Sequence, residues 1–291
     1  MDEIFKNILR RDNNYEALTH LDMYNNEHFK KLKINLVDKS YIDEDFKNSI
    51  DDNWRILLRK NPGMHNNPKV GVDKNSFRID NGVLNFDVYQ SNFKNMMGTS
   101  REFTSERSIY LLGCKSIYSF ILKDHFHILL GQRRNRNVEI KGKIQAIPAG
   151  FVELDDLDKT SPLEETIRRE YIEEIEDDGY LDAVKLKTIE DSFSNYQKKL
   201  LGFSWIRDYG CVDADFFLIN KDESWIYNNN YIEQNKNWNI IRKKKGFFKE
   251  HELVFAVPYN KIEEFIFEFK DDISVASKYL LLKSSEYRLI S

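Results

Sequence analysis

The sequence has few cysteines and no long apolar run, the features from which secreted, zinc-binding and membrane proteins are recognised. Its 291 residues include only two cysteines, Cys114 and Cys211, which form neither a disulfide framework nor a zinc-ligand pattern. No apolar run approaches about 20 residues, and the charged residues 1–6 lack the apolar core of a signal peptide. We therefore expect a protein of the reducing cytoplasm with no membrane partner.

A surplus of charge of one sign is also missing. Charged residues make up 32% of the chain, yet the formal net charge is only −4. There is thus no overall basic field of the kind that drives nonspecific binding to nucleic acids. No internal repeat is present, and the length suffices for a sizeable core in one or two domains.

Residues 1–105 are predicted to form an N-terminal α/β extension or a small domain. Up to residue 60, short helical patterns alternate with polar breaks, and after residue 68 apolar and polar side chains alternate as in strands. The predicted elements are an amphipathic helix at 44–59 that stops at 61–63, strands within 69–89 with a turn at 80–82, and a short segment from Phe93 to Gly98.

Residues 106–291 are predicted to form a second, mainly β-rich unit. The patterns predict strands or hairpins at 110–122, 127–134, 183–196 and 201–219, a long insertion or lid at 221–250, a loop entering a strand at 250–258, and helices at 261–269 and 273–287. Aromatic side chains in the insertion (Trp225, Tyr227, Tyr231 and Trp238) either pack half-buried or stack on a base.

The most informative stretch, residues 149–174, is predicted to be a strand end, an acidic loop and a helix. Ser161 is a suitable N-cap residue, Pro162 suits the first helical position, and Glu164 stands where a capping box needs it. The sequence therefore predicts that the helix begins at residue 162.

Three glutamates on this helix form the candidate metal site. At about 100° per residue, Glu170, Glu173 and Glu174 fall within an arc of about 100°. Glu170 and Glu174 form a like-charge pair one turn apart, and the helix dipole disfavours acidic groups in the second half of a helix. Mg²⁺ or Mn²⁺ would relieve both penalties because hard cations prefer carboxylate oxygens. The alternative is a solvated acidic face.

The same stretch resembles the Nudix box, Gly-x5-Glu-x7-Arg-Glu-U-x-Glu-Glu-x-Gly-U, in which U is a bulky apolar residue. Gly150 matches the first glycine, and residues 169–174 match the core without a gap. The loop after Glu153 carries about five extra residues, a kind of insertion that loops tolerate. The middle glutamate of the pattern then aligns with Ser161 or with Asp156.

Two smaller departures from the box concern glycines. Glu176 stands where the family has its last glycine, and Ala149 replaces the first residue of the usual glycine pair. The resemblance implies an α/β (α+β) fold, a Nudix α/β/α sandwich with a mixed sheet, carrying the N-terminal α/β extension. It also implies a Nudix hydrolase that needs Mg²⁺ or Mn²⁺ to cleave a diphosphate.

The resemblance also assigns roles to individual residues. Glu170, Glu173 and Glu174, with the backbone carbonyl of Ala149, would hold the metal, and Arg169 would orient the glutamates. The general base stays open between Glu170, Glu174 and Glu252, with Glu250 and Asp213 as further acidic candidates. Substrate binding is assigned to Arg133, Arg134 and Glu153, although a solvated basic loop is the alternative for the arginines. His251 alone is read as a structural hydrogen-bonding group.

Three functions remain open on the sequence. The first is hydrolysis of a nucleoside diphosphate-linked compound, with a sugar favoured because Asn61-Pro62, Tyr89, Phe93 and Gly98-Thr99 resemble the extension of the UDP-sugar hydrolase branch. The second is decapping of RNA, against which the lack of a basic patch with interleaved aromatics argues. The third is a non-catalytic nucleotide-metabolite sensor. A homodimer is compatible with each of them.

Overall fold

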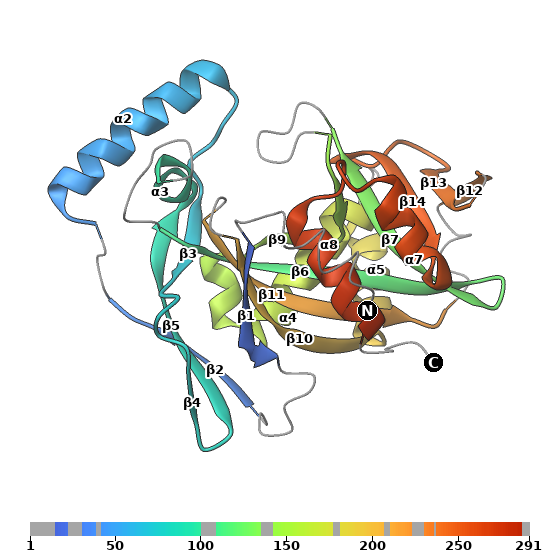
Figure 1. The fold of residues 1–291 in the computed structure, drawn as a ribbon, viewed down its shortest axis with the longest axis horizontal. Coiled ribbons are helices and arrows are strands. Elements are labelled where there is room, and N and C mark those ends of the chain that lie inside the picture. The colour runs from blue at the N-terminus through green and yellow to red at the C-terminus, as the bar shows by residue number, and fades with distance from the viewer. Residues whose placement is uncertain are drawn as a thin grey trace.

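The computed structural model describes residues 15–22, 31–38, 42–99, 109–134, 142–176, 181–206, 210–222, 230–235 and 237–286. Within these ranges, fourteen strands join into one branched mixed sheet (Figure 1). No described helix combines the length and the apolar character needed to cross a membrane.

The main path of the sheet runs β1–β10–β11–β6–β7–β14–β13–β12. The bounds of these strands are Tyr15–Asp22 (β1), Leu111–Leu122 (β6), His125–Arg133 (β7), Gln197–Ile206 (β10), Cys211–Asn220 (β11), Asn230–Gln234 (β12), Asn239–Lys243 (β13) and His251–Pro258 (β14). Strands β11 and β6 run parallel, and the other neighbours on this path run antiparallel.

Strand β6 is central because its side chains alternate between two apolar cores. Leu112 and Tyr118 pack in the core that also holds side chains of α4 (Pro162–Tyr171) and α5 (Ala183–Ser194). Ile117 points to the opposite core, which is covered by α7 (Ile262–Glu268) and α8 (Val275–Glu286). Helices therefore cover both faces of a mixed sheet, as the predicted α/β/α fold class requires.

Two short strands, β8 (Ile144–Ala146) and β9 (Ala149–Phe151), lie next to the candidate site and pair with β7 and β6, respectively. Strand β7 pairs with β6 only along residues 119–122 of β6, and β9 pairs with residues 113–115 instead. The sheet thus opens beside β9, and Gly150 faces the helix that follows it.

The N-terminal extension contains the predicted elements. They are α2 (Glu44–Lys60), β3 (Pro68–Val72), β4 (Arg78–Asp80), β5 (Val83–Asn92) and α3 (Phe93–Gly98). The turn between β4 and β5 has positive φ angles at Asn81 and Gly82, 51° and 75°, as a two-residue hairpin turn requires. Trp54 and Leu57 of α2 are buried, and Trp54 packs edge-on against Phe93.

The extension and the rest of the chain share one sheet and one core. The backbone N–H of Val70 donates to the carbonyl of Val152 at 3.2 Å, and that of Val72 donates to Tyr110 at 2.9 Å. Val70 and Val72 pack in the same core as Leu112. The predicted boundary at residue 105 lies outside the described residues and stays a prediction.

Two predictions of secondary structure are wrong. Residues 183–196 are not a strand: α5 covers Ala183–Ser194, its N-terminus is capped by the Asp182 side chain, and Ile189 and Phe193 are buried at helical spacing. Near the N-terminus, β1 and β2 (Lys31–Leu36) replace the short helical patterns, because β1 pairs with β10 and β2 pairs with β5. Long-range pairing here outweighs local pattern.

The insertion contains the β12–β13 hairpin, which extends the edge of the sheet from β14. Trp238 is 5% exposed and packs edge-on against Phe265 and Phe269, so it is a core residue, whereas Tyr231 is exposed. Trp225 and Tyr227 lie outside the described residues. Strand β14 and the two C-terminal helices confirm the predictions for these segments, and residue 287 is not described.

Candidate active site

The acidic helix begins where the sequence predicts, but for a simpler reason. Helix α4 starts at Pro162, while the side chain of Ser161 makes no capping hydrogen bond. The preference of proline for the first helical position therefore accounts for the start without the predicted capping box. Beyond Tyr171 the helix continues through Ile172–Glu176 as a wider, π-type turn. Such turns are rare and concentrate at functional sites.

The three glutamates differ in exposure. The side chains of Glu170 and Glu174 are 12% and 0% exposed, whereas that of Glu173 is 54% exposed. Tyr171, Ile172 and Ile175 pack in the core. One flank of the helix thus packs, and the other presents carboxylates toward β9.

Gly150 makes room for the carboxylate of Glu170. A Cβ atom at position 150 would lie 2.0 Å from Cδ of Glu170 and 2.1 Å from its Oε1. No residue other than glycine fits this close approach unless the carboxylate moves. The strand end and the helix are therefore matched at this pair of residues.

Burial raises the pKa of Glu170 to about 8, and the charge of Glu174 adds to this rise, although Arg169 opposes it. Burial also raises the pKa of Glu173. The carboxylates are thus crowded into a setting where one negative charge disfavours the next. A bound cation would reverse that penalty.

Glu174 is held on one side and unmatched on the other. Its Oε2 accepts the backbone N–H of Ala149 at 2.9 Å. Its Oε1 is buried and has no hydrogen-bond partner among the described residues, with Arg133 Nη2 at 3.5 Å and His251 Nε2 at 3.6 Å. Ala149, predicted to contribute its carbonyl to a metal, thus contacts this glutamate through its N–H.

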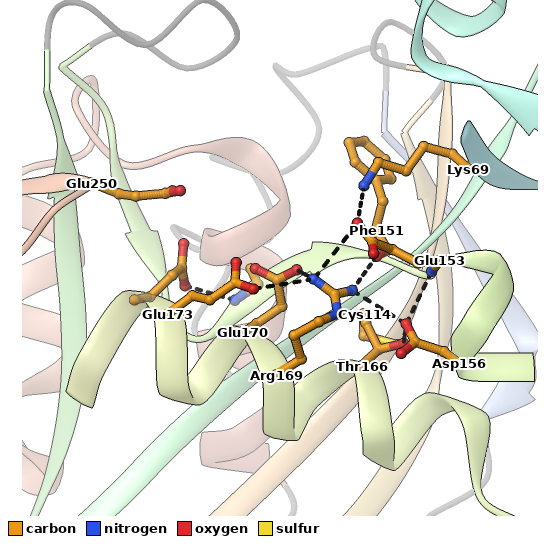
Figure 2. Close-up of polar contacts among 12 residues, drawn as sticks. Lys69, Cys114, Phe151, Glu153, Asp156, Thr166, Arg169, Glu170, Glu173 and Glu250 are labelled. Atoms are coloured by element: carbon orange, nitrogen blue, oxygen red, sulfur yellow. Dashed lines mark hydrogen bonds and ion pairs between the residues drawn. The ribbon is translucent and has the colours of Figure 1, made fainter. Parts of the chain in front are cut away.

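Arg169 lies at the centre of the site and joins loop to helix (Figure 2). Its guanidinium donates to the carbonyl of Phe151 at 2.8 Å, to Oδ2 of Asp156 at 3.2 Å and to Oε1 of Glu170 at 2.6 Å. The predicted orienting role of Arg169 fits these contacts, because the side chain is fixed at both ends.

The sequence left open whether Ser161 or Asp156 aligns with the middle glutamate of the box. In the structure, Asp156 is the residue that contacts Arg169. It is buried, and its Oδ2 accepts from Arg169, from Thr166 Oγ1 at 2.9 Å and from the backbone N–H of Glu153 at 3.0 Å. The extra loop residues form a short 3₁₀ helix, Leu154–Asp158. The insertion therefore still delivers a carboxylate to the central arginine.

The N-terminal extension contributes Lys69 to the edge of the site. The ammonium of Lys69, on β3, points to Glu153 (Figure 2) and lies 2.7 Å from its Oε1. Burial alone would raise the pKa of Glu153, but the hydrogen bond and charge of Lys69 outweigh it and lower the pKa. Sequence reasoning missed Lys69, because nothing in its local pattern indicates pairing with a loop 84 residues away.

The two predicted phosphate-binding arginines lie at the other end of the site. Arg133 forms an ion pair with Glu250 and lies 3.5 Å from Glu174. Arg134 donates to the carbonyl of Phe248 at 3.1 Å, and its guanidinium lies 5.0 Å from the ring centroid of Phe247. Arg133 thus faces the carboxylates, while Arg134 stabilises the loop before β14.

The position of Glu250, beside Arg133, suits the extra acidic group predicted outside the box better than the position of the first candidate, Glu252. Glu252 is exposed, whereas its neighbours Glu250 and His251 face Arg133 and Glu174. Asp213 lies on β11, in a buried cluster in which Lys115 contacts both Asp213 and Asp215 at 3.2 Å. The charge of Lys115 is already matched there by these two carboxylates.

The residues present fit a divalent cation by charge. Glu170 and Glu174 are close enough for their charges to interact, and Glu174 Oε1 is a buried oxygen without a donor in the described part of the chain. No three side chains of His, Cys, Asp or Glu converge on one point within that part. Arg169 donates to Glu170 Oε1 and the Ala149 N–H donates to Glu174 Oε2, so these two oxygens already accept hydrogen bonds.

No family model and no curated protein matches the chain. Solved structures do match it: the Nudix domain of Shewanella oneidensis NrtR complexed with ADP ribose (15% identity, 62% of this chain and 89% of that chain, TM-score 0.34) and a C. elegans Ap4A hydrolase in a binary complex (13%, 61% and 96%, 0.33). A third is a mutT/nudix family protein from Listeria innocua (16%, 62% and 98%, 0.31).

Two of these three structures, those from Shewanella oneidensis and Listeria innocua, are named as Nudix proteins. This is the family whose box residues 149–174 resemble, so the chain is similar to Nudix proteins both in its box and in the solved structures that match it. At these identities and TM-scores, a likeness does not transfer activity, metal or substrate.

Proposed function

We propose that the chain is a divalent-metal-dependent pyrophosphohydrolase. Its substrate class would be a nucleoside diphosphate linked to a second group, and its product a nucleoside monophosphate. The observation that carries the proposal is the buried pair Glu170 and Glu174, in which burial and mutual repulsion raise the pKa of Glu170 to about 8. A cation bound by the two carboxylates would offset the burial and the repulsion that a proton on Glu170 otherwise offsets.

Each residue of the site has a task in this reaction. Glu170, Glu173 and Glu174 would hold Mg²⁺ or Mn²⁺, which when bound neutralises phosphate charge and lowers the pKa of water. Arg169 keeps Glu170 in place through its contacts to Phe151 and Asp156. The general base stays open between Glu170, Glu174 and the exposed Glu252, with Glu250, beside Arg133, as a further candidate.

A positively charged side chain lies at each end of the site, where it could contact a phosphorylated substrate. Arg133 faces the carboxylates from β7, and its planar guanidinium suits bidentate contact with phosphate oxygens once it leaves Glu250. Lys69 and Glu153 form the opposite end, in a position to contact the group beyond the diphosphate. A sugar as that group remains part of the proposal because of the sequence resemblance of the extension, and the cytoplasm as the location because of the scarcity of cysteine.

The proposal is tested with purified full-length chain, Mg²⁺ or Mn²⁺, and a substrate panel. The panel holds UDP-sugars, ADP-ribose, dinucleoside polyphosphates, NAD, CoA and capped RNA, and release of nucleoside monophosphate is measured. Glu174→Gln should abolish turnover of whichever compound is cleaved. The matched control is Glu164→Gln, which changes an exposed glutamate of the same helix and should leave turnover unchanged.

Two results would overturn the proposal. If Glu174→Gln turns over substrate at the wild-type rate, the site is assigned to the wrong residues. If calorimetry finds tight binding of one panel compound while no product forms with either metal, the chain is a sensor instead of an enzyme.

A further inference from the structure

His251 is a buried histidine that faces Glu174. Its side chain is fully buried, and neither ring nitrogen has a hydrogen-bond partner among the described residues. Nε2 lies 3.6 Å from Glu174 Oε1, the oxygen that also lacks a donor. In the described part of the chain, two buried polar atoms without hydrogen bonds therefore face each other across a gap only slightly longer than a hydrogen bond.

The backbone is shaped to place this ring. The pairing of β14 with β7 shifts between His251 and Leu253, so that Glu252 is an extra residue and points to solvent. Bulges of this kind re-aim side chains and are frequent beside active sites. The ring then lies against Gly131 of β7, where a Cβ would come within 2.5 Å of Nδ1. A bulge and a glycine are thus both needed to bring the ring to Glu174.

We propose that His251 is a positioning residue that donates its Nε2–H to Glu174 Oε1 and so fixes the carboxylate for a divalent cation. This inference rests on the proposed function only in that Glu174 is taken as a cation ligand. Oε2 already accepts the Ala149 N–H, so a second donor on Oε1 would prevent rotation of the carboxylate. Each oxygen keeps a second lone pair for a cation. Catalytic hydrogen bonds that are long in an unliganded protein often shorten when the ligand binds.

Arg133 is the other donor near Oε1, and its geometry differs. Its Nη2 lies 3.5 Å from Oε1, but its Nη1 is paired with Glu250 at the surface of the site. Arg133 is 19% exposed, whereas His251 is fully enclosed. The histidine is therefore the donor that stays fixed when a substrate draws Arg133 away.

The test measures Mn²⁺ binding to the full-length chain without substrate, by electron paramagnetic resonance and calorimetry. His251→Leu removes both nitrogens. His251→Asn keeps an amide near the Nδ1 position, and His251→Gln places an amide N–H near the Nε2 position. We expect Mn²⁺ affinity to fall about 10- to 100-fold in the Leu and Asn variants. The Gln variant should return to within about threefold of wild type. Thermal unfolding with a chelator shows whether each variant is folded.

Several outcomes would overturn the inference. Folded His251→Leu that binds Mn²⁺ as wild type does would show that the ring has no positioning role. Equal losses in folded Leu and Gln variants would show that packing, not the donor, matters. If the variants do not fold, ¹⁵N NMR of the wild-type ring decides, because the inference requires the proton on Nε2. Mn²⁺ binding without turnover of any panel compound would defeat the proposed function but leave this inference standing.

Discussion

Replacing Glu170 by glutamine should change how the stability of the metal-free protein depends on pH. Burial, with the added charge of Glu174, raises the pKa of Glu170 from 4.5 to about 8 in the folded state. The folded protein therefore binds this proton more tightly than the unfolded chain does. The resulting stabilisation is complete below pH about 4.5 and is lost as the pH rises through about 8.

The size of the effect follows from the pKa difference. A difference of about 3.5 at 1.36 kcal/mol per pKa unit corresponds to about 5 kcal/mol, which is an upper limit. Glu170 lies beside the more exposed Glu173 and can relax toward solvent when it ionises, so we expect about 2–3 kcal/mol. Glutamine carries no titratable proton and cannot lose this contribution.

The assay is urea unfolding in excess chelator at several pH values between 5 and 8.5. Across this range, the free energy of unfolding of Glu170→Gln should rise by about 2–3 kcal/mol relative to wild type. Glu164→Gln, on the same helix but exposed, serves as the control and should follow wild type. If the free energy of unfolding of Glu170→Gln instead follows that of wild type at every pH, burial does not raise the pKa of Glu170. The charge argument for a cation then fails.

Three further predictions test the site and the packing around it. Gly150→Ala puts a Cβ 2.0 Å from Cδ of Glu170 and should weaken Mn²⁺ binding at least about tenfold in calorimetry, so unchanged affinity would contradict the close approach. Tyr171→Phe removes the hydroxyl that donates to Glu176 at 2.6 Å and should cost about 1–3 kcal/mol in urea unfolding, whereas a neutral result would mean that water replaces it. Trp54→Ala should cost about 3–5 kcal/mol and raise hydrogen exchange along α2 first; uniform exchange would show that α2 does not depend on this side chain.

Much of the fold could be predicted where the information is local. The helix at α2 and the turn at Asn81–Gly82 depend on side chains within a few residues of each other, and both were predicted. The sequence misplaced α5 because its apolar residues also fit a short strand. It missed β1 and β2 because these strands exist through partners that are distant in the chain.

The same division applies to the candidate site. The helix spacing alone brings Glu170 and Glu174 together, so the carboxylates could be found in the sequence. The departure from the family glycine at Glu176 also has a local explanation, since this buried carboxylate accepts a hydrogen bond from Tyr171. The role of Lys69 and the approach of His251 to Glu174 could not be predicted, because a strand pairing places Lys69 and a β-bulge re-aims His251.

The position of Lys69 bears on the role of the N-terminal extension. Strand β3 bonds to β5 of the extension along its length, yet the N–H of Val70 donates to Val152, the residue that follows β9. The neighbouring Lys69 reaches Glu153, one residue further along. One strand thus fixes both the backbone and the charge of the loop that leads to Arg169. The extension is therefore part of the wall of the candidate site, and a change in its sequence can alter the surroundings of Glu153 without touching Glu170 or Glu174.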